Sequence, residues 1–430
     1  MQLTFSHAKD LPEGWKLAPV AAYCNVIDPQ PDHRAPLIDP NGFPYIGIRD
    51  VNPDGTVNEM SARMVSEKAV IKQESAFSIE KGDIVFCKVG TLGEPRHLEA
   101  EGKRIALSAT LVLIKAKINC CSRYLKHVLD SDYMYAQIFR IITGATRPAL
   151  GIQQIRKLRL PFPQKDEQVL IANFLDKKTV QINEAIAIKE QQINLLKERK
   201  HIIIQKAVTQ GIDPNVPLKD SRVDWIGKIP EHWEVKRAKY IFDEVDERSE
   251  TGNEELLSVS HMTGVTPRSE KNVSMFMAED YTGSKLCREN DLVINIMWAW
   301  MGALGVSNHV GIVSPSYGVF RQKIENTFNS IYLEYLLKSV NYVEYYNKVS
   351  TGLHSSRLRF YGHMFFAMKM GYPCYAEQNE IIAYLSEQTK RIDVAVDSQL
   401  AQIEKLKEYK TTLINSAVTG KIKITLEMVE

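Results

Sequence analysis

Residues 167–209 read EQVLIANFLDKKTVQINEAIAIKEQQINLLKERKHIIIQKAVT, and residues 377–419 read EQNEIIAYLSEQTKRIDVAVDSQLAQIEKLKEYKTTLINSAVT. About 17 of these 43 aligned positions are identical, at an offset of 210 residues. Neither stretch contains Gly or Pro, so each is predicted to be one long helix. An internal match of this length indicates a duplicated chain, and it predicts two copies of one structural unit.

Shorter matches extend the duplication to the segment before each helix. LPEGW at 11–15 matches IPEHW at 229–233, and SRYLKHVLDS at 122–131 matches SIYLEYLLKS at 330–339. Each segment contains short β-rich runs, such as GDIVFCKV and NDLVINIMWAW, that are interrupted by Gly, Pro and Asn and mixed with helical stretches. We therefore expect an α+β globular domain before each helix, with the Trp of each PE-x-W motif buried in its core.

The two predicted helices share an apolar repeat of seven residues. A heptad repeat with charged flanks is typical of coiled-coil packing, although two unrelated surface helices would be the alternative. If the helices pair, the second must run back toward the first domain, so the pair is expected to be antiparallel with one domain at each end. The seam positions are Leu175, Ile182, Lys189, Leu196 and Ile203 in the first helix, and Leu385, Ile392, Gln399, Leu406 and Leu413 in the second.

These patterns predict an α+β fold class: two globular α/β domains joined by two long antiparallel coiled-coil helices, in a tandem repeat with a pseudo-two-fold axis. The expected boundaries are 1–163 for the first globular domain, 164–213 for the central helical region, 214–373 for the second globular domain and 374–430 for the distal helical region.

Composition favours an ordinary soluble protein. The 54 basic and 52 acidic side chains give a formal charge of +2, which selects no partner class. The six cysteines form no CxxC pair and no zinc-finger spacing, so reduced thiols and no metal are expected. No secretory pattern opens the chain, and no apolar stretch approaches the roughly 18 residues of a membrane span. We expect a cytoplasmic protein with no membrane partner.

Across essentially its whole length the chain resembles the DNA specificity (S) subunits of Type I restriction–modification systems. The resemblance is carried by LPEGW and IPEHW at the domain starts, LPFPQKDEQVLIANFLD at 160–176, and LINSAVTGKI at 413–422. It implies that each globular domain is a target recognition domain that reads one half of a split site on double-stranded DNA. It also implies that the helices set the spacing of the half-sites.

The same resemblance implies the partners. Modification (methyltransferase) subunits, expected to be two, would dock on the helical regions, and restriction (translocase and nuclease) subunits would join through the complex. No catalytic residue and no cofactor are expected in this chain. Two alternatives stay open: a coiled-coil scaffold with two protein-binding heads, and a self-contained restriction or methylation enzyme. The second lacks both an Asn/Asp-Pro-Pro-aromatic motif and a GxxxxGK[ST] motif.

Candidate DNA contacts follow from the chemistry of groove reading, which uses cations for phosphates and forked or planar side chains for base edges. A Gly-containing loop follows the GDIVFCKV strand, although an ordinary turn with a solvated lysine is the alternative. Donor-rich loops occupy matching places at 143–157 and 351–363. Trp298 and Trp300 alternate as residues on a strand do. Either one of them is a wedge that faces DNA, or both are core residues. The predicted contacts are Lys88, Thr91, Thr146, Arg147, Gln153, Gln154, Arg156, His354, Ser355, Ser356, Arg357, Arg359, Arg268 and Trp298.

Overall fold

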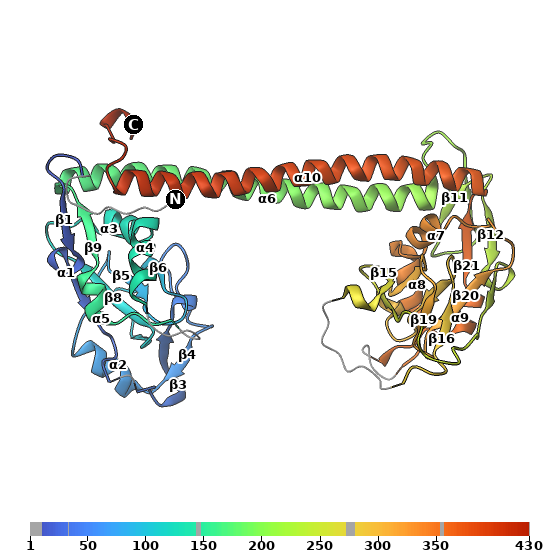
Figure 1. Cartoon of the computed structure of the whole chain (residues 1–430), viewed down its shortest axis with the longest axis horizontal. Coiled ribbons are helices and arrows are strands. Elements are labelled where there is room, and N and C mark those ends of the chain that lie inside the picture. The colour runs from blue at the N-terminus through green and yellow to red at the C-terminus, as the bar shows by residue number, and fades with distance from the viewer. Residues whose placement is uncertain (1–10, 33, 143–147, 272–279, 353–356, 430) are drawn as a thin grey trace. The chain divides into compact units, whose positions relative to one another are not determined.

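The computed structural model describes residues 11–32, 34–142, 148–271, 280–352 and 357–429, and it contains two compact units (Figure 1). The first unit is formed by Met1–Glu190 and Leu400–Glu430, and the second by Gln191–Gln399. Two long helices, α6 (Lys165–Gln210) and α10 (Tyr375–Val418), contribute to both units. The rest of each unit is a globular part that we call its head.

The first head is built on a four-stranded antiparallel sheet in the order β2-β8-β5-β6. The strands β5 and β8 are buried on both faces, which explains their continuous apolar sequences IVFC and LVLI. The sheet strands are β2 (Cys24–Ile27), β5 (Ile84–Cys87), β6 (Gly93–His97) and β8 (Leu111–Ala116). The remaining elements are β1 (Lys16–Pro19), α1 (Val20–Tyr23), β3 (Ile38–Ile46), β4 (Arg63–Val65), α2 (Glu67–Glu74), β7 (Ala106–Leu107), α3 (Ser122–Leu129), α4 (Asp132–Ile141), α5 (Ile152–Lys157) and β9 (Arg159–Phe162).

The second head contains a four-stranded antiparallel sheet in the order β13-β20-β17-β18. Its strands are β13 (Phe242–Glu244), β17 (Leu292–Ile294), β18 (Leu304–Val306) and β20 (Gly318–Gln322). The remaining elements are β10 (Leu218–Asp220), β11 (Lys228–Pro230), β12 (Glu234–Arg237), β14 (Leu257–Ser260), β15 (Gly264–Pro267), β16 (Lys285–Cys287), β19 (Gly311–Val313), α7 (Ser330–Leu337), α8 (Val340–Val349), α9 (Gly362–Ala367) and β21 (Lys369–Tyr372).

The two heads share one connectivity. In each, a strand near the PE-x-W motif pairs with the strand that precedes the long helix: β1 with β9, and β12 with β21. Each four-stranded sheet is followed by two consecutive helices, α3 and α4 or α7 and α8. The α+β class and the tandem repeat predicted from the sequence are confirmed.

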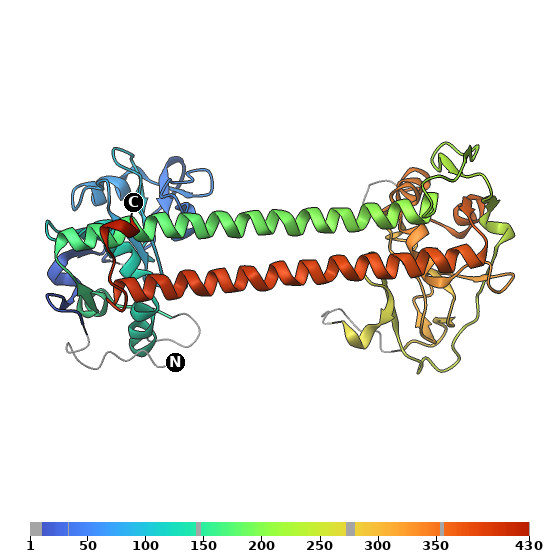
Figure 2. The same ribbon diagram turned by 90° about the horizontal axis from the view of Figure 1, so that it is seen from above.

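The long helices pack against each other in antiparallel fashion within each unit (Figures 1 and 2). In the first unit Lys189 Nζ donates to Gln402 Oε1 at 2.6 Å, and Lys410 Nζ donates to Asn183 Oδ1 at 2.9 Å. As the position on α6 decreases from 189 to 183, the position on α10 rises from 402 to 410, so the directions are opposite. In the second unit Lys200 Nζ pairs with Asp393 at 2.7 Å.

The ten predicted seam positions are all buried or half-buried. In the first unit Leu175 and Ile182 share an apolar cluster with Leu413, and in the second Leu385 lies in the cluster of its own head. The polar seam residue Lys189 is half-buried and reaches across to α10. Each head is therefore packed against one end of α6 and one end of α10.

Candidate nucleic-acid interface

The Glu residue at the start of each long helix ties that helix to its own head. Trp15 Nε1 donates to Glu167 Oε1 at 3.1 Å, and Trp233 Nε1 donates to Glu377 Oε1 at 3.0 Å. Trp233 is 1% exposed, and Trp15 is half-buried. The PE-x-W motif thus positions the head on the helix, and both tryptophans take part in the anchor.

The Gln residue that follows each Glu makes a second anchor. Gln168 Oε1 accepts from the backbone N–H of Cys121 at 2.8 Å, and its Nε2 donates to the Pro163 carbonyl at 2.9 Å. Gln378 Oε1 accepts from the backbone N–H of Asn329 at 2.9 Å in the same way. Both glutamines are fully buried. The Glu-Gln pair, which opens both matching stretches of the sequence, is therefore a structural clamp.

The ends of the long helices are held by buried tyrosines. Tyr124 donates to the Val418 carbonyl at 3.4 Å in the first unit, and Tyr332 donates to the Val208 carbonyl at 3.0 Å in the second. Burial raises the pKa of Tyr124 and Tyr332 well above the usual value, so both hydroxyls stay protonated as donors. Each head is thus fixed to a helix start and a helix end.

Two loops that are far apart in sequence lie together in the first head. The hairpin loop, residues 88–92, connects β5 to β6, and the partner loop, residues 148–151, precedes α5. Gly90 N–H donates to the Pro148 carbonyl at 2.9 Å, and Leu150 N–H donates to the Lys88 carbonyl at 2.8 Å. The structure therefore brings the two predicted contact segments together, and Thr91 is exposed there. Thr146 and Arg147 lie outside the described residues.

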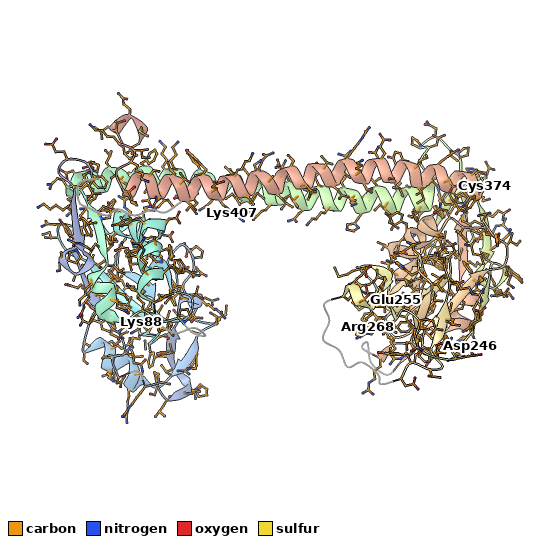
Figure 3. The ribbon with its side chains drawn as sticks, viewed as in Figure 1. Lys88, Asp246, Glu255, Arg268, Cys374 and Lys407 are labelled. Atoms are coloured by element: carbon orange, nitrogen blue, oxygen red, sulfur yellow. The ribbon has the colours of Figure 1, made fainter. Side chains whose placement is uncertain are left out.

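Lys88 itself points into the head (Figure 3). The residue is 3% exposed, and its Nζ lies 2.6 Å from Asp28 Oδ2, a carboxylate that is also largely buried. A buried lysine needs such a partner, because an unpaired ammonium away from water is strongly unfavourable. The geometry gives Lys88 a structural role beneath the loop. A solvated lysine on an ordinary turn, the alternative drawn from the sequence, is wrong.

The other predicted residues of the first head lie on a helix, where the sequence predicted a loop. Gln154 Oε1 accepts from Gly151 N–H at 2.7 Å, which caps α5, and its Nε2 donates to the Ile141 carbonyl at 2.9 Å. Arg156 Nη2 donates to the Val26 carbonyl at 2.8 Å. Gln153 is exposed. Of these three side chains, Gln153 is the one presented to solvent for binding.

The second head pairs the matching loops. Its hairpin loop, residues 295–303, connects β17 to β18, and its partner loop, residues 357–361, precedes α9. Phe360 N–H donates to the Ile296 carbonyl at 3.0 Å. Arg357 is exposed, whereas Arg359 is half-buried and its Nη1 donates to the Leu358 carbonyl at 2.9 Å.

Three predicted contacts of the second head, His354, Ser355 and Ser356, lie outside the described residues. Arg268 is half-buried in a short 3₁₀ helix after β15 (Figure 3), and its backbone N–H donates to the Leu256 carbonyl at 2.8 Å.

Trp298 and Trp300 do not lie on a strand. Strand β17 ends at Ile294, and Ala299–Met301 form a 3₁₀ turn, so the strand-like alternation was a wrong interpretation. The two indoles stack with centroids 6.0 Å apart and an angle of 29° between their planes. Trp298 is 44% exposed, which also rules out the interpretation of two core tryptophans.

A buried aspartate stands at the start of the central strand in both heads. Asp291 accepts hydrogen bonds from Arg321 Nε at 2.7 Å and from its Nη2 at 2.8 Å. Asp83 accepts one from Lys115 Nζ at 2.8 Å. The hydrogen bonds from Arg321 to Asp291 raise the pKa of the guanidinium. These carboxylates are engaged in holding neighbouring strands. Within the described ranges, 11–32, 34–142, 148–271, 280–352 and 357–429, no three His, Cys, Asp or Glu side chains gather as a metal site would require.

Two relatives match nearly the whole chain. The putative type I restriction enzyme MjaX specificity subunit of Methanocaldococcus jannaschii is 22% identical over 433 residues, which cover 96% of this chain and 95% of the relative. The type I restriction enzyme MjaVIII specificity subunit of the same organism is 22% identical over 446 residues, which cover 97% of this chain and 95% of the relative.

Two solved structures share the fold. A chain from a study of the structural basis underlying complex assembly and conformational transition of the type I R-M system has a TM-score of 0.67 at 17% identity, with 96% of this chain and 99% of that chain covered. The HsdS subunit from Thermoanaerobacter tengcongensis has a TM-score of 0.54 at 17% identity, with 96% and 98% covered.

The profile of the Type I restriction modification DNA specificity domain matches residues 12–198. This match covers less than half of the chain, namely the first head and much of α6. Both relatives bear the name of specificity subunit.

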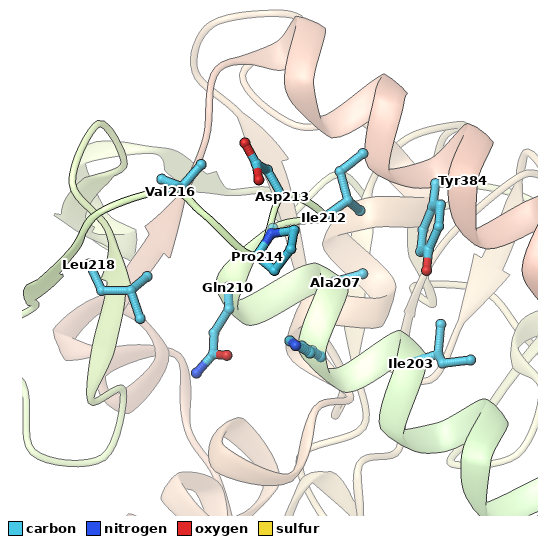
Figure 4. A pocket seen from close by; sticks show the side chains of 11 residues that line it. Ile203, Ala207, Gln210, Ile212, Asp213, Pro214, Val216, Leu218 and Tyr384 are labelled. Carbon is cyan, nitrogen blue, oxygen red and sulfur yellow. The ribbon is translucent and has the colours of Figure 1, made fainter.

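Cavities occur where α6 ends in the second unit. One of about 280 Å³ is lined by Ile203, Gln210, Asp213 and Tyr384, among others (Figure 4). A larger one of about 820 Å³ lies on the side of α7 and α8 and is lined in part by Ile202, Met262 and Val340. No helix in the described part of the chain is long and apolar enough to cross a membrane.

Proposed function

We propose that this chain is a Type I DNA specificity subunit and that each head reads one half of a bipartite site on double-stranded DNA. The observation that carries the proposal is the repeated loop pair: in both heads the hairpin loop is hydrogen-bonded to the partner loop at the same place on the same sheet. Side chains that can hydrogen-bond to bases or phosphates are exposed on these loops or on the helix that follows, with Thr91 and Gln153 in the first head and Arg357 in the second.

The remaining candidates divide by their geometry. Gln154, Arg156 and Arg359 already make hydrogen bonds within their heads, so we assign them to positioning of the loops or to phosphate contacts through their other donors. Lys88 supports the hairpin loop from below. Arg268 remains a proposed phosphate contact.

We further propose that α6 and α10 set the spacing of the half-sites and dock two modification subunits, with restriction subunits joining through that complex in the cytoplasm. Exposed apolar side chains on α6 support a docking role: Val180 and Ile188 in the first unit, and Leu195 and Ile202 in the second. Met262 and Val340, which line the larger cavity, are also exposed.

Mapping of methylated bases in DNA from cells that carry the subunit with its natural partners tests the function. We expect two short specific blocks separated by an unspecified spacer. Exchange of residues 1–160 with those of a relative should change one block and leave the other intact. A protein scaffold would instead show no sequence preference over competitor DNA, and that result would contradict DNA reading.

The spacing role has its own test. Insertion of four residues, about one helical turn, between Leu175 and Ile203 lengthens α6 by about 6 Å. We expect the spacer length in the methylated site to change while both blocks keep their sequence. An altered base preference within either block, with the spacer unchanged, would contradict the ruler role.

A further inference from the structure

The hairpin loop of the second head is mostly apolar and carries two tryptophans, unlike its counterpart in the first. Asn295 is buried at its base, where its Oδ1 accepts from Met297 N–H at 3.2 Å and its Nδ2 donates to Tyr317 Oη at 3.0 Å. Gly302 adopts a φ of +80°, which closes the turn in a conformation that favours glycine. The loop is thus held from inside the head.

This framework presents one flat aromatic side chain to solvent. Trp298 is 44% exposed, and its inner face stacks on Trp300, whose Nε1 donates to the Met297 carbonyl at 3.1 Å. Met301, the next apolar side chain of the turn, is 39% exposed. An exposed indole with an exposed apolar neighbour offers a flat surface on which a partner can stack.

The neighbourhood of the loop indicates the partner. The carbonyl of Ile296 accepts from Phe360 N–H, so the exposed Arg357 and the half-buried Arg359 belong to the segment beside the tryptophans. An exposed aromatic ring on a loop that is hydrogen-bonded to an arginine-bearing segment suits nucleic acid, because bases stack on the ring while cations meet the phosphates. In the first head the same loop contains Gly90, Thr91 and Leu92, with no aromatic residue.

We propose that Trp298 is a wedge that stacks on a base of the half-site read by the second head and opens a base step there, with Trp300 as its support. The inference rests on the proposed function, because it presumes that the heads read DNA. It adds that the subunit distorts one half-site and leaves the other stacked. Flexible base steps cost less free energy to open than stiff ones, so the wedge also contributes to sequence preference.

The test uses the full chain assembled with its natural modification subunits and duplexes that carry the methylated site. 2-Aminopurine is placed at each position of both half-sites in turn, apart from the base that is methylated. With the unaltered chain we expect fluorescence to rise severalfold at one step of the second half-site. Trp298→Ala should abolish that rise and weaken binding roughly 10- to 100-fold, as expected for loss of one base–aromatic stack.

Three controls separate the wedge from other roles. Trp298→Phe keeps a ring and should retain most of the fluorescence rise. Tyr240→Ala removes an aromatic side chain, 64% exposed, from a part of the second head outside both loops and should change neither signal. The first half-site should respond identically in every variant. Native mass spectrometry of each assembly checks that the modification subunits remain bound.

Other outcomes would contradict either the wedge or the proposed function. Specific binding with no fluorescence rise in the second half-site, or a rise that persists in Trp298→Ala, overturns the wedge and leaves the DNA-reading function intact. Loss of modification subunits from Trp298→Ala, with normal DNA affinity once assembled, would make Trp298 a protein anchor instead. If the unaltered assembly shows no sequence preference at all, the proposed function fails and the wedge fails with it.

Discussion

The two heads have the same framework and different loops. The sheets match strand for strand, in the orders β2-β8-β5-β6 and β13-β20-β17-β18, and the Trp–Glu anchor occurs in both. The hairpin loop differs most clearly, with GTLG at 90–93 in the first head and WAWM at 298–301 in the second. The comparison teaches that the conserved hydrogen bonds position the loops, while the loop side chains are free to differ.

The framework itself is not chemically identical in the two copies. The buried aspartate of the central strand meets a lysine in the first head and a forked guanidinium in the second. Arginine can give two hydrogen bonds to one carboxylate, whereas lysine gives a point charge on a flexible chain. Loss of this aspartate should therefore lower the unfolding free energy by different amounts in the two heads.

The largest expected effect comes from Asp291→Ala compared with Asp83→Ala. Asp291 is fully buried and loses two bonds from Arg321, so we expect the second unit to lose about 3–5 kcal/mol of unfolding free energy. Asp83→Ala should cost about 2–3 kcal/mol, because Asp83 loses a single bond from Lys115. In both variants the cation keeps another partner, the Ser78 carbonyl for Lys115 and Glu247 for Arg321. Hydrogen exchange of peptides from each head under native conditions measures both. Equal losses would contradict the distinction.

Much of the architecture could be predicted because periodic sequence patterns specify it. The heptad positions predict which faces of the long helices meet, and Leu175 and Leu385 are buried as that pattern requires. The offset of 210 residues predicts the repeated heads. These features depend on spacing along one chain segment, which a sequence shows directly.

The candidate contacts were harder to predict because they depend on partners distant in sequence. Lys88 is paired with Asp28, 60 residues away. The Gln154 amide already makes two hydrogen bonds, one that caps α5 and one to the Ile141 carbonyl. Trp298 and Trp300 stand two residues apart, which fits a strand and a tight turn equally well. The local sequence contained no signal that chose between them.

The next largest effect is expected from Gln168→Leu and Gln378→Leu, which should lower the unfolding free energy of their own units by the same amount. Each glutamine is fully buried and bonds the N-terminal end of a helix in its head, Cys121 before α3 or Asn329 before α7. Replacement leaves one N–H and two carbonyls without these partners, so each variant should lose about 2–3 kcal/mol in its own unit. Urea unfolding followed by hydrogen exchange compares the two. A difference above about 1 kcal/mol would show that the clamp is not equivalent in the two copies.

The smallest expected effect distinguishes the heads by pH. Asp176 on α6 accepts from His127 Nε2 at 2.7 Å and from Arg123 Nη1 at 2.9 Å, whereas the matching residue on α10 is Ser386. Burial acts to raise the pKa of Asp176, but the hydrogen bonds and charges of His127 and Arg123 outweigh burial and hold this pKa below the usual 3.8.

A carboxyl group whose pKa is lower in the folded state stabilises the fold above the unfolded pKa, and this stability is lost as the pH falls through the folded value. Asp176→Ser should therefore destabilise the first unit by about 0.5–1 kcal/mol at pH 7, a modest value because the Asp176 side chain is 39% exposed. The difference between variant and unaltered chain should shrink as the pH falls below about 4, toward the folded pKa. Hydrogen exchange of α3 peptides across this range measures it, with Ser386→Ala as the control that should change nothing. A difference that stays constant with pH would mean that Asp176 acts through packing and not through its charge.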